Sequence, residues 1–243
     1  MKLALITDPR GFSVVDQFQM SYHLVLAQYV RMETKYSDYY REKGERGCFL
    51  MMDNGAAENL QLKLHELKSA AELIRPDEII LPDVLADSVA TLEATKNPEV
   101  LEFVPPRQRA VVPQGDTFDS WLHCANNMVN EMDFATMCVP KHTERFPGGR
   151  PTLLSTIEKL GWHKYYNIHL LGIWGNPKTE LAALKEFKWV RGIDTAAPFA
   201  WAQHKLEIFD SDTLHVSHTW GKRFDRTLAF ENVNNLWSKV WSY

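Results

Sequence analysis

Short apolar runs alternate with stretches of helical periodicity along most of the chain, at spacings of roughly 25 to 35 residues. The run from Cys48 to Met52 is continuous rather than alternating with polar residues, as expected for a strand that helices cover on both faces. Successive strand and helix units of this kind indicate a parallel sheet. We predict strands at residues 3–7, 48–52, 78–81, 109–113, 134–139, 167–173 and 190–194.

Between these runs, apolar residues recur at helical spacing. In the segment 17–41, for example, Tyr22, Leu26, Tyr29 and Val30 share one face of a helix. We predict helices at residues 17–41, 58–74, 88–95, 117–130, 152–160, 179–187 and 235–241.

The number of repeated units favours a (β/α)8 TIM-like barrel. A barrel of this type uses about 250 residues, and the chain has 243, so we predict one α/β domain over residues 1–243. An open doubly wound sheet is the alternative fold. Its usual cofactor motifs, GxGxxG after the first strand and GxxxxGK[ST], are missing from the sequence.

The composition, with 45% hydrophobic and 24% charged residues, is that of a soluble globular protein. No apolar run approaches the ~20 residues that cross a bilayer, and Asp8 interrupts the first run before a signal-peptide core could form. Cys48, Cys124 and Cys138 are odd in number, far apart and without CxxC spacing, which argues against disulfides and structural zinc. We therefore expect a cytoplasmic protein that makes no membrane contact.

The formal net charge of −4 is not that of a strongly basic nucleic-acid-binding domain. A nucleic-acid partner would have to be held by a local basic patch. One candidate patch contains Lys141, Arg145 and Arg150, and a second contains Lys222 and Arg223. Small clusters of this kind are also common on solvated surfaces, so that interpretation remains open.

Polar residues follow several of the predicted strands. Asp53, Asp83 and Asp194 each stand at the end of an apolar run, and Gln114 with Gly115 follows another. Catalytic groups of an α/β barrel lie at these strand ends, and a carboxylate there can act as nucleophile, proton acceptor or ligand for an N–H group. Taken singly, each aspartate also fits a helix cap or a turn, and Gln114 fits a surface loop.

The motifs around these residues resemble the tRNA-guanine transglycosylase superfamily. The stretch from Leu170 to Glu180, followed by Arg191 to Asp194, is similar to that family's strand, Gly-x-Pro turn and strand. Each motif is short, but their order along the chain matches the family across roughly residues 48 to 200.

The resemblance implies a role for each matching residue. Asp53 resembles the aspartate of the family's Asp-Ser-Gly-Gly motif, Asp83 its substrate-binding aspartate, and Gln114 with Gly115 its base-reading Gln-Gly pair. The resemblance implies a TIM-like barrel. It also implies that base exchange needs no cofactor.

The sequence departs from the tRNA enzymes in two ways. Their cysteine and histidine zinc subdomain has no counterpart, and their Asp-x-Phe-Asp nucleophile motif is replaced by the sequence from Asp194 to Pro198. Collinear placement puts their nucleophile on Ala197, which leaves Asp194 as the carboxylate of that turn. A short chain without zinc resembles the phage and bacterial branch that inserts 7-deazaguanine derivatives into DNA.

The implied reaction exchanges guanine in DNA for a free base such as 7-cyano-7-deazaguanine. Asp194 would attack the sugar, as a retaining glycosidase does, and Asp53 would move the proton, which requires a raised pKa. Asp83 and Gln114 would bind the Watson–Crick edge of the base. The resemblance adds backbone contacts from three further positions, which are Gly115, Cys138 and Val139.

Two alternatives remain at the level of sequence. The same chemistry on tRNA is disfavoured by the missing zinc subdomain, and a non-catalytic relative that binds nucleic acid or protein is favoured by the altered nucleophile motif. His215 and His218 lack a third ligand at useful spacing, so we expect no metal site. The sequence leaves open a helper protein or a homodimer, and a phage-encoded chain would act in the cytoplasm of its host.

Overall fold

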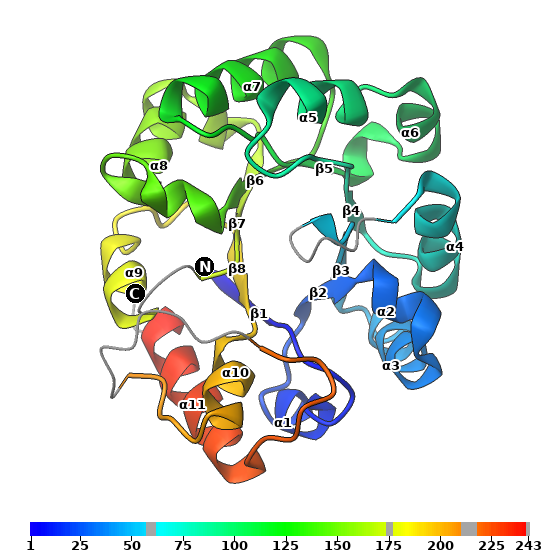
Figure 1. Cartoon of the computed structure of the whole chain (residues 1–243), viewed down its shortest axis with the longest axis vertical. Helices are drawn as coiled ribbons and strands as arrows, with labels where there is room; N and C mark the ends of the chain where they lie inside the picture. Colours follow the sequence, from blue (N-terminus) through cyan, green and yellow to red (C-terminus); the bar gives the residue numbers. More distant parts are fainter. Residues whose placement is uncertain (57–61, 174–176, 210–217, 242–243) are drawn as a thin grey trace.

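The computed structural model describes residues 1–56, 62–173, 177–209 and 218–241, and in this part of the chain eight parallel strands form one sheet. The order of the strands is β1-β8-β7-β6-β5-β4-β3-β2, and β1 and β2 at its two ends lie next to each other (Figure 1). The sheet is therefore a nearly closed barrel. Its strands are β1 Lys2–Leu5, β2 Tyr22–Leu26, β3 Phe49–Asp53, β4 Glu78–Ile80, β5 Arg109–Val111, β6 Thr136–Pro140, β7 Asn167–Leu171 and β8 Gly192–Thr195.

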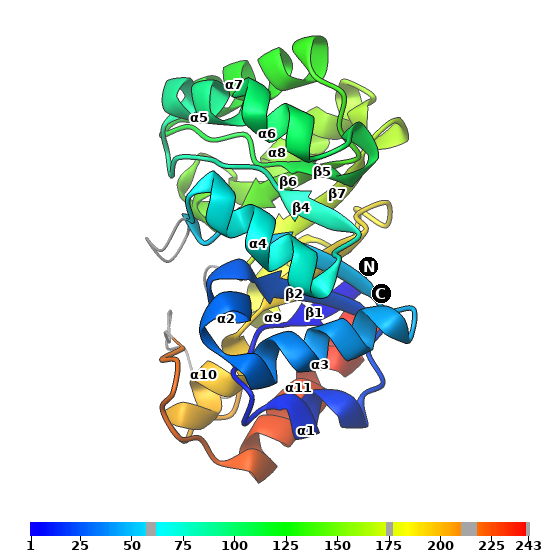
Figure 2. The same ribbon diagram turned by 90° about the vertical axis from the view of Figure 1, so that its right-hand side faces the viewer.

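Helices surround the barrel and alternate with the strands along the chain, which confirms the predicted (β/α)8 fold (Figures 1 and 2). Within the described ranges, short 3-10 helices at Pro106–Gln108, Lys141–Arg145 and Trp162–Lys164 join them. The α-helices are α1 Phe12–Gln17, α2 Ala27–Met32, α3 Thr34–Glu45, α4 Leu64–Ile74, α5 Ser88–Thr95, α6 Pro98–Phe103, α7 Phe118–Glu131, α8 Gly149–Lys159, α9 Pro177–Ala183, α10 Ala197–Gln203 and α11 Arg226–Trp241.

Local sequence explains where several of these helices begin and which face they bury. Asp87 caps α5 by accepting a hydrogen bond from the Ala90 N–H group, and Thr117 caps α7 by accepting one from Ser120. Along α7, the buried positions include Trp121 and Met128, which lie two turns apart on one face. Helix α7 thus covers the sheet with one largely apolar stripe.

One prediction about the fold is wrong. Residues 17–41 do not form a single helix, because the chain leaves α1 at Gln17, forms strand β2 and then continues through α2 and α3. All five residues of β2 are buried, as in a strand with both faces covered, and apolar residues in such a strand also satisfy a helical spacing. The sequence pattern therefore did not predict the eighth strand of the barrel, and it also missed α1, α6 and α10.

The N-terminal end of the barrel is closed by a buried ionic cluster. Arg191 donates from both terminal guanidinium nitrogens to the two carboxylate oxygens of Glu78, at 2.7 and 2.6 Å. The Thr136 hydroxyl donates to the same carboxylate at 2.8 Å, and the guanidinium lies 4.9 Å from the centre of the Phe49 ring. Every charge in this cluster has a partner of opposite sign. The N-terminus lies at this end of the molecule (Figure 2).

The predictions about membrane-spanning helices, metal sites and disulfides can be examined only in the described residues. None of the helices there has the length and apolar character that a membrane crossing requires. Within the same residues no three potential ligands are grouped as a metal site would need, while His215 lies outside them. The three cysteines are free thiols.

Candidate active site

A cavity of about 470 Å³ opens at the C-terminal end of the barrel, where the residues that follow the strands converge. Its volume is within the range of about 300–1,000 Å³ that is typical of small-molecule sites. Its wall contains charged and polar side chains as well as apolar and aromatic ones. Among the residues that line it are Asp53, Asp83, Gln114, Lys141, Asp194 and Trp220.

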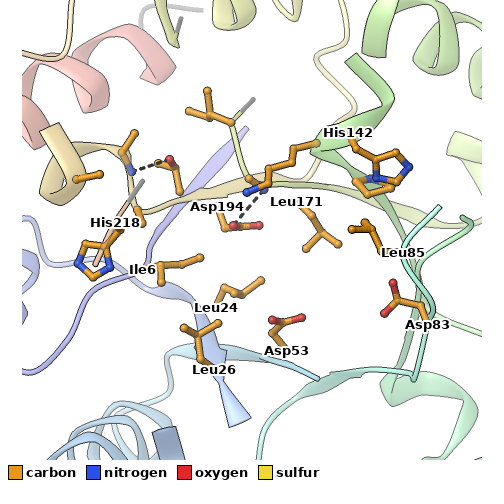
Figure 3. A pocket seen from close by; sticks show the side chains of 18 of the residues that line it. Ile6, Leu24, Leu26, Asp53, Asp83, Leu85, His142, Leu171, Asp194 and His218 are labelled. Carbon is orange, nitrogen blue, oxygen red and sulfur yellow. Dashed lines mark hydrogen bonds between the residues drawn. The ribbon is translucent and has the colours of Figure 1, made fainter. Parts of the chain in front are cut away.

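Three aspartates from distant parts of the sequence face this cavity. Figure 3 shows the carboxylates of Asp53, Asp83 and Asp194 directed toward the same hollow from different sides. Asp53 ends β3 and Asp194 lies within β8, while Asp83 follows β4 by a few residues. The fold thus brings together the residues that the sequence pattern singled out.

Asp83 is the centre of a buried network of neutral amides. Its two carboxylate oxygens accept hydrogen bonds from Asn54 Nδ2, at 2.8 Å, and from Gln114 Nε2, at 2.5 Å. The backbone fixes both amides, because Asn54 also donates to the Leu81 carbonyl and Gln114 Oε1 accepts from the Ala86 N–H group. Neither amide can therefore turn its NH₂ group away from Asp83 without losing a bond.

The environment of this carboxyl changes its proton affinity. Asp83 is 5% exposed, and the two amides that contact it carry no charge. Burial raises the pKa of Asp83 above its ordinary value of 3.8, and the hydrogen bonds from Asn54 and Gln114 oppose the increase. Titratable groups with shifted pKa values are common at functional sites, particularly in cavities.

Asp194 is held by N–H donors on both of its oxygens. His169 Nε2 lies 2.9 Å from Oδ1, and the Gly172 N–H group donates to Oδ2 at 3.1 Å. Gly172 has a φ of +66°, in the left-handed region that favours glycine, and this conformation aims its N–H group at the carboxylate. Asp194 itself is 3% exposed, so its orientation is fixed by these contacts.

Asp53 is more accessible than the other two aspartates. Its side chain is half-buried, and the Gly55 N–H group lies 3.4 Å from Oδ2. The neighbouring Asn54 points toward Asp83 instead, so consecutive residues serve different parts of the cavity.

Three of the residues expected to contact the base do not line the cavity. Cys138 and Val139 are fully buried inside β6, and the chain first reaches the cavity at Pro140 and Lys141. Gly115 lies behind the wall, where its carbonyl accepts a hydrogen bond from Nε2 of His142 at 3.2 Å. None of these three positions lines the cavity, and their contact with a base stays a prediction.

The basic residues divide into three groups. Lys141 and Arg145 line the cavity, whereas Lys222 and Arg223 are exposed on the segment that precedes α11. The prediction is wrong for Arg150, whose side chain is fully enclosed.

Arg150 has a structural role instead. Its guanidinium donates to Glu180 Oε1 at 2.8 Å and to the Gly172 carbonyl at 2.7 Å, and it also bonds to the Leu171 carbonyl. Because these contacts occupy the side chain inside the protein, it cannot reach a nucleic-acid backbone. It instead holds the backbone that carries the Gly172 donor to Asp194.

Sequence reasoning missed three residues of this site, which are Asn54, His142 and His169. A signal for His169 was present, since a titratable side chain in the middle of an apolar strand must find a partner when it is buried. Asn54 and His142 carried no comparable signal. No family model matches the sequence, and no curated protein matches it significantly.

Proposed function

We propose that the protein exchanges guanine in DNA for a free 7-deazaguanine base through a covalent sugar–enzyme intermediate. The observation that carries this proposal is the convergence of Asp53, Asp83, Gln114 and Asp194 on one cavity. The family resemblance assigns these residues complementary roles, and a base-exchange reaction needs all of them within reach of one nucleotide.

Asp83 and Gln114 in the cavity wall suit the Watson–Crick edge of guanine. This edge carries N–H donors at N1 and N2 and an acceptor at O6. Asp83 supplies acceptors for the donors, and the remaining N–H of the Gln114 amide supplies a donor for O6, since Ala86 fixes the amide's orientation. A 7-deazaguanine base has the same edge, so one site can bind the leaving and the incoming base in turn.

The reaction then takes place in two displacements. An Asp194 oxygen forms a bond to C1′ of the sugar while the bond from C1′ to N9 breaks, and its electron pair leaves with guanine as Asp53 supplies a proton. In the second step the incoming base loses its N9 proton to Asp53 and attacks C1′. The bond from C1′ to Asp194 breaks, and the carboxylate is restored.

The wall and mouth of the cavity provide contacts for the rest of the nucleotide. Lys141 and Arg145 line it, and cationic side chains of this kind bind phosphates. A base that reacts in such a cavity must leave the stack of the duplex. DNA is chosen over tRNA because the sequence resembles the branch that lacks the zinc subdomain.

The test is an exchange assay with DNA or tRNA that contains labelled guanine, incubated with unlabelled 7-cyano-7-deazaguanine. The proposal predicts release of label from DNA, and loss of release in Asp53→Asn and Asp194→Asn variants that remain folded. Release from tRNA alone would contradict the choice of DNA. Binding of DNA without any release would favour a non-catalytic protein.

A further inference from the structure

A buried polar chain leads from Asp194 into the interior of the barrel. His169 Nε2 lies 2.9 Å from Asp194 Oδ1, and His169 Nδ1 lies 2.9 Å from the hydroxyl of Tyr22. His169 is fully buried and Tyr22 is 2% exposed, so water does not compete for these bonds. The three residues come from β8, β7 and β2, on both sides of the place where β1 completes the barrel.

The partners of His169 determine which ring nitrogen carries the proton. A carboxylate can only accept, so Nε2 must donate to Asp194. In the neutral ring Nδ1 is then the acceptor, and the Tyr22 hydroxyl donates to it. Burial raises the pKa of Tyr22, which keeps this hydroxyl protonated and able to donate.

The shape of the site distinguishes the two oxygens of Asp194. Gly172, the donor to Oδ2, lines the cavity, whereas His169, the donor to Oδ1, lies inside the barrel and is not part of the cavity wall. Oδ2 therefore faces the space that a sugar would occupy, and Oδ1 faces away from it.

Room for Tyr22 depends on a residue of the same sequence motif. A Cβ atom at Gly192 would lie 2.8 Å from Cε1 of Tyr22 and 3.1 Å from the Lys2 carbonyl oxygen, so a larger residue would displace the ring. On its other side, the guanidinium of Arg191 lies 5.5 Å from the centre of the Tyr22 ring. Arg191 and Gly192, the two residues before Ile193 and Asp194, thus fix the position of the Tyr22 ring.

We propose that His169 and Tyr22 are positioning residues that hold Asp194 so that Oδ2 attacks the sugar and Oδ1 becomes the carbonyl oxygen of the ester. This inference rests on the proposed function. In the first displacement Oδ2 bonds to C1′ and the electron pair of the glycosidic bond leaves with the base. His169 keeps its proton throughout, and its bond to Oδ1 persists in the ester.

Kinetic variants separate this role from a general effect on folding. Replacing His169 by Leu removes the donor, and we expect kcat for base exchange to fall roughly 10- to 100-fold while KM changes less than about threefold. His169→Gln restores an N–H donor near the position of Nε2 and should recover most of the loss. Tyr22→Phe should lower kcat about 3- to 10-fold.

Matched controls are available elsewhere in the barrel. His23→Leu removes a second fully buried histidine, and Tyr40→Phe removes the hydroxyl of a buried tyrosine, both outside the cavity wall. These variants should leave kcat within about twofold of wild type when activity is expressed per folded molecule. Equal losses in the controls and in His169→Leu would overturn the inference.

Nitrogen-15 NMR of the histidine rings provides a readout that does not depend on exchange. Wild-type His169 should carry a proton on Nε2, and Tyr22→Phe should change the distribution of protons between the two ring nitrogens. An Nε2 without a proton in the wild type, or a normal kcat in His169→Leu, would refute the role of His169. Wild-type protein that shows the expected ring but exchanges no base would instead refute the proposed function on which the inference rests.

Discussion

The two ends of the barrel each bury a carboxylate, and the two carboxylates differ in the charge of their hydrogen-bond partners. Glu78, at the N-terminal end, is bound by both terminal nitrogens of the Arg191 guanidinium and by the Thr136 hydroxyl. Asp83, only five positions later in the chain, has two neutral amides as its partners in the cavity. A full opposite charge compensates the first carboxylate, whereas two neutral amide groups donate hydrogen bonds to the second.

This difference separates stability from function within one fold. In α/β barrels the N-terminal end serves stability and the C-terminal end carries the reaction. Both oxygens of Glu78 accept hydrogen bonds from Arg191, and Thr136 donates a further one to this carboxylate. The cavity keeps Asp83 and Asp194 oriented by donors that leave further lone pairs for a substrate.

The largest effect should come from Asp194 at the cavity. Because Asp194→Asn removes the proposed nucleophile, we expect base exchange to fall about 10⁴-fold, while affinity for 7-cyano-7-deazaguanine stays within about threefold of wild type. Rapid-quench kinetics and calorimetric titration measure the two quantities separately. Exchange that persists within tenfold of wild type would exclude Asp194 as the nucleophile.

The closed end should respond in stability rather than in activity. Glu78→Gln leaves the Arg191 guanidinium without its carboxylate partner, so the free energy of unfolding should fall by roughly 3–5 kcal/mol. Urea denaturation measures this change, with the exposed Glu231→Gln on α11 as a control that should change it by less than about 0.5 kcal/mol. A loss below about 1 kcal/mol for Glu78→Gln would remove the contrast between the two ends.

Replacing Asp83 should weaken recognition of the base. Asp83→Asn exchanges an acceptor for a group that also donates, and we expect affinity for the free base to fall roughly 10- to 100-fold. Calorimetry measures this affinity, and the exposed Asp119→Asn is the matched control that should leave it unchanged. Unchanged affinity in Asp83→Asn would show that the base binds elsewhere.

The same variant makes a prediction about pH. Because burial raises the pKa of Asp83 in the folded protein above 3.8, the folded state binds this proton more tightly than the unfolded chain does. The contribution of Asp83 to stability is therefore greatest at low pH and is lost as the pH rises through the folded pKa. The stability of Asp83→Asn relative to wild type should increase across that range in urea titrations, and a constant difference would contradict the shift.

The smallest effect should come from the basic residues around the cavity. Lys141→Ala removes one of the proposed phosphate contacts, so DNA affinity should fall about 3- to 10-fold and the slope of log K against log salt should decrease by about 0.9. Fluorescence anisotropy at several salt concentrations measures both, and Lys159→Ala on the exposed end of α8 should change neither. Equal effects of the two substitutions would indicate diffuse attraction rather than a site.

The sequence was sufficient to predict the barrel because its strands are marked by continuous apolar runs and by breaks before each helix. The exception, β2, carries apolar residues whose spacing also fits a helix, and its strand pairing depends on β3, which lies far away in the sequence. In the structure, pairing with β3 and burial on both faces show that this segment is a strand and not a helix.

The sequence predicted the strand-end residues of the site but not the partners that orient them. Asp53, Asp83, Gln114 and Asp194 each follow or end a strand, so the fold brings them to one mouth. The partners that orient them could not be predicted, because hydrogen bonds such as that from Asn54 to Asp83 join residues 29 positions apart. Arg150 was misassigned for the same reason, since its charge is visible in the sequence and its enclosure beside Glu180 is not.

The most direct test of the account is to find the atom that carries the sugar during the reaction. Wild-type protein would be mixed with guanine-containing DNA in the absence of an incoming base, quenched in acid and digested, and the peptides that retain a nucleotide would be sequenced by mass spectrometry. The nucleotide should be attached to Asp194, and free guanine should be released in equal amount. Attachment at another residue, or guanine release with no adduct at any residue, would contradict the account.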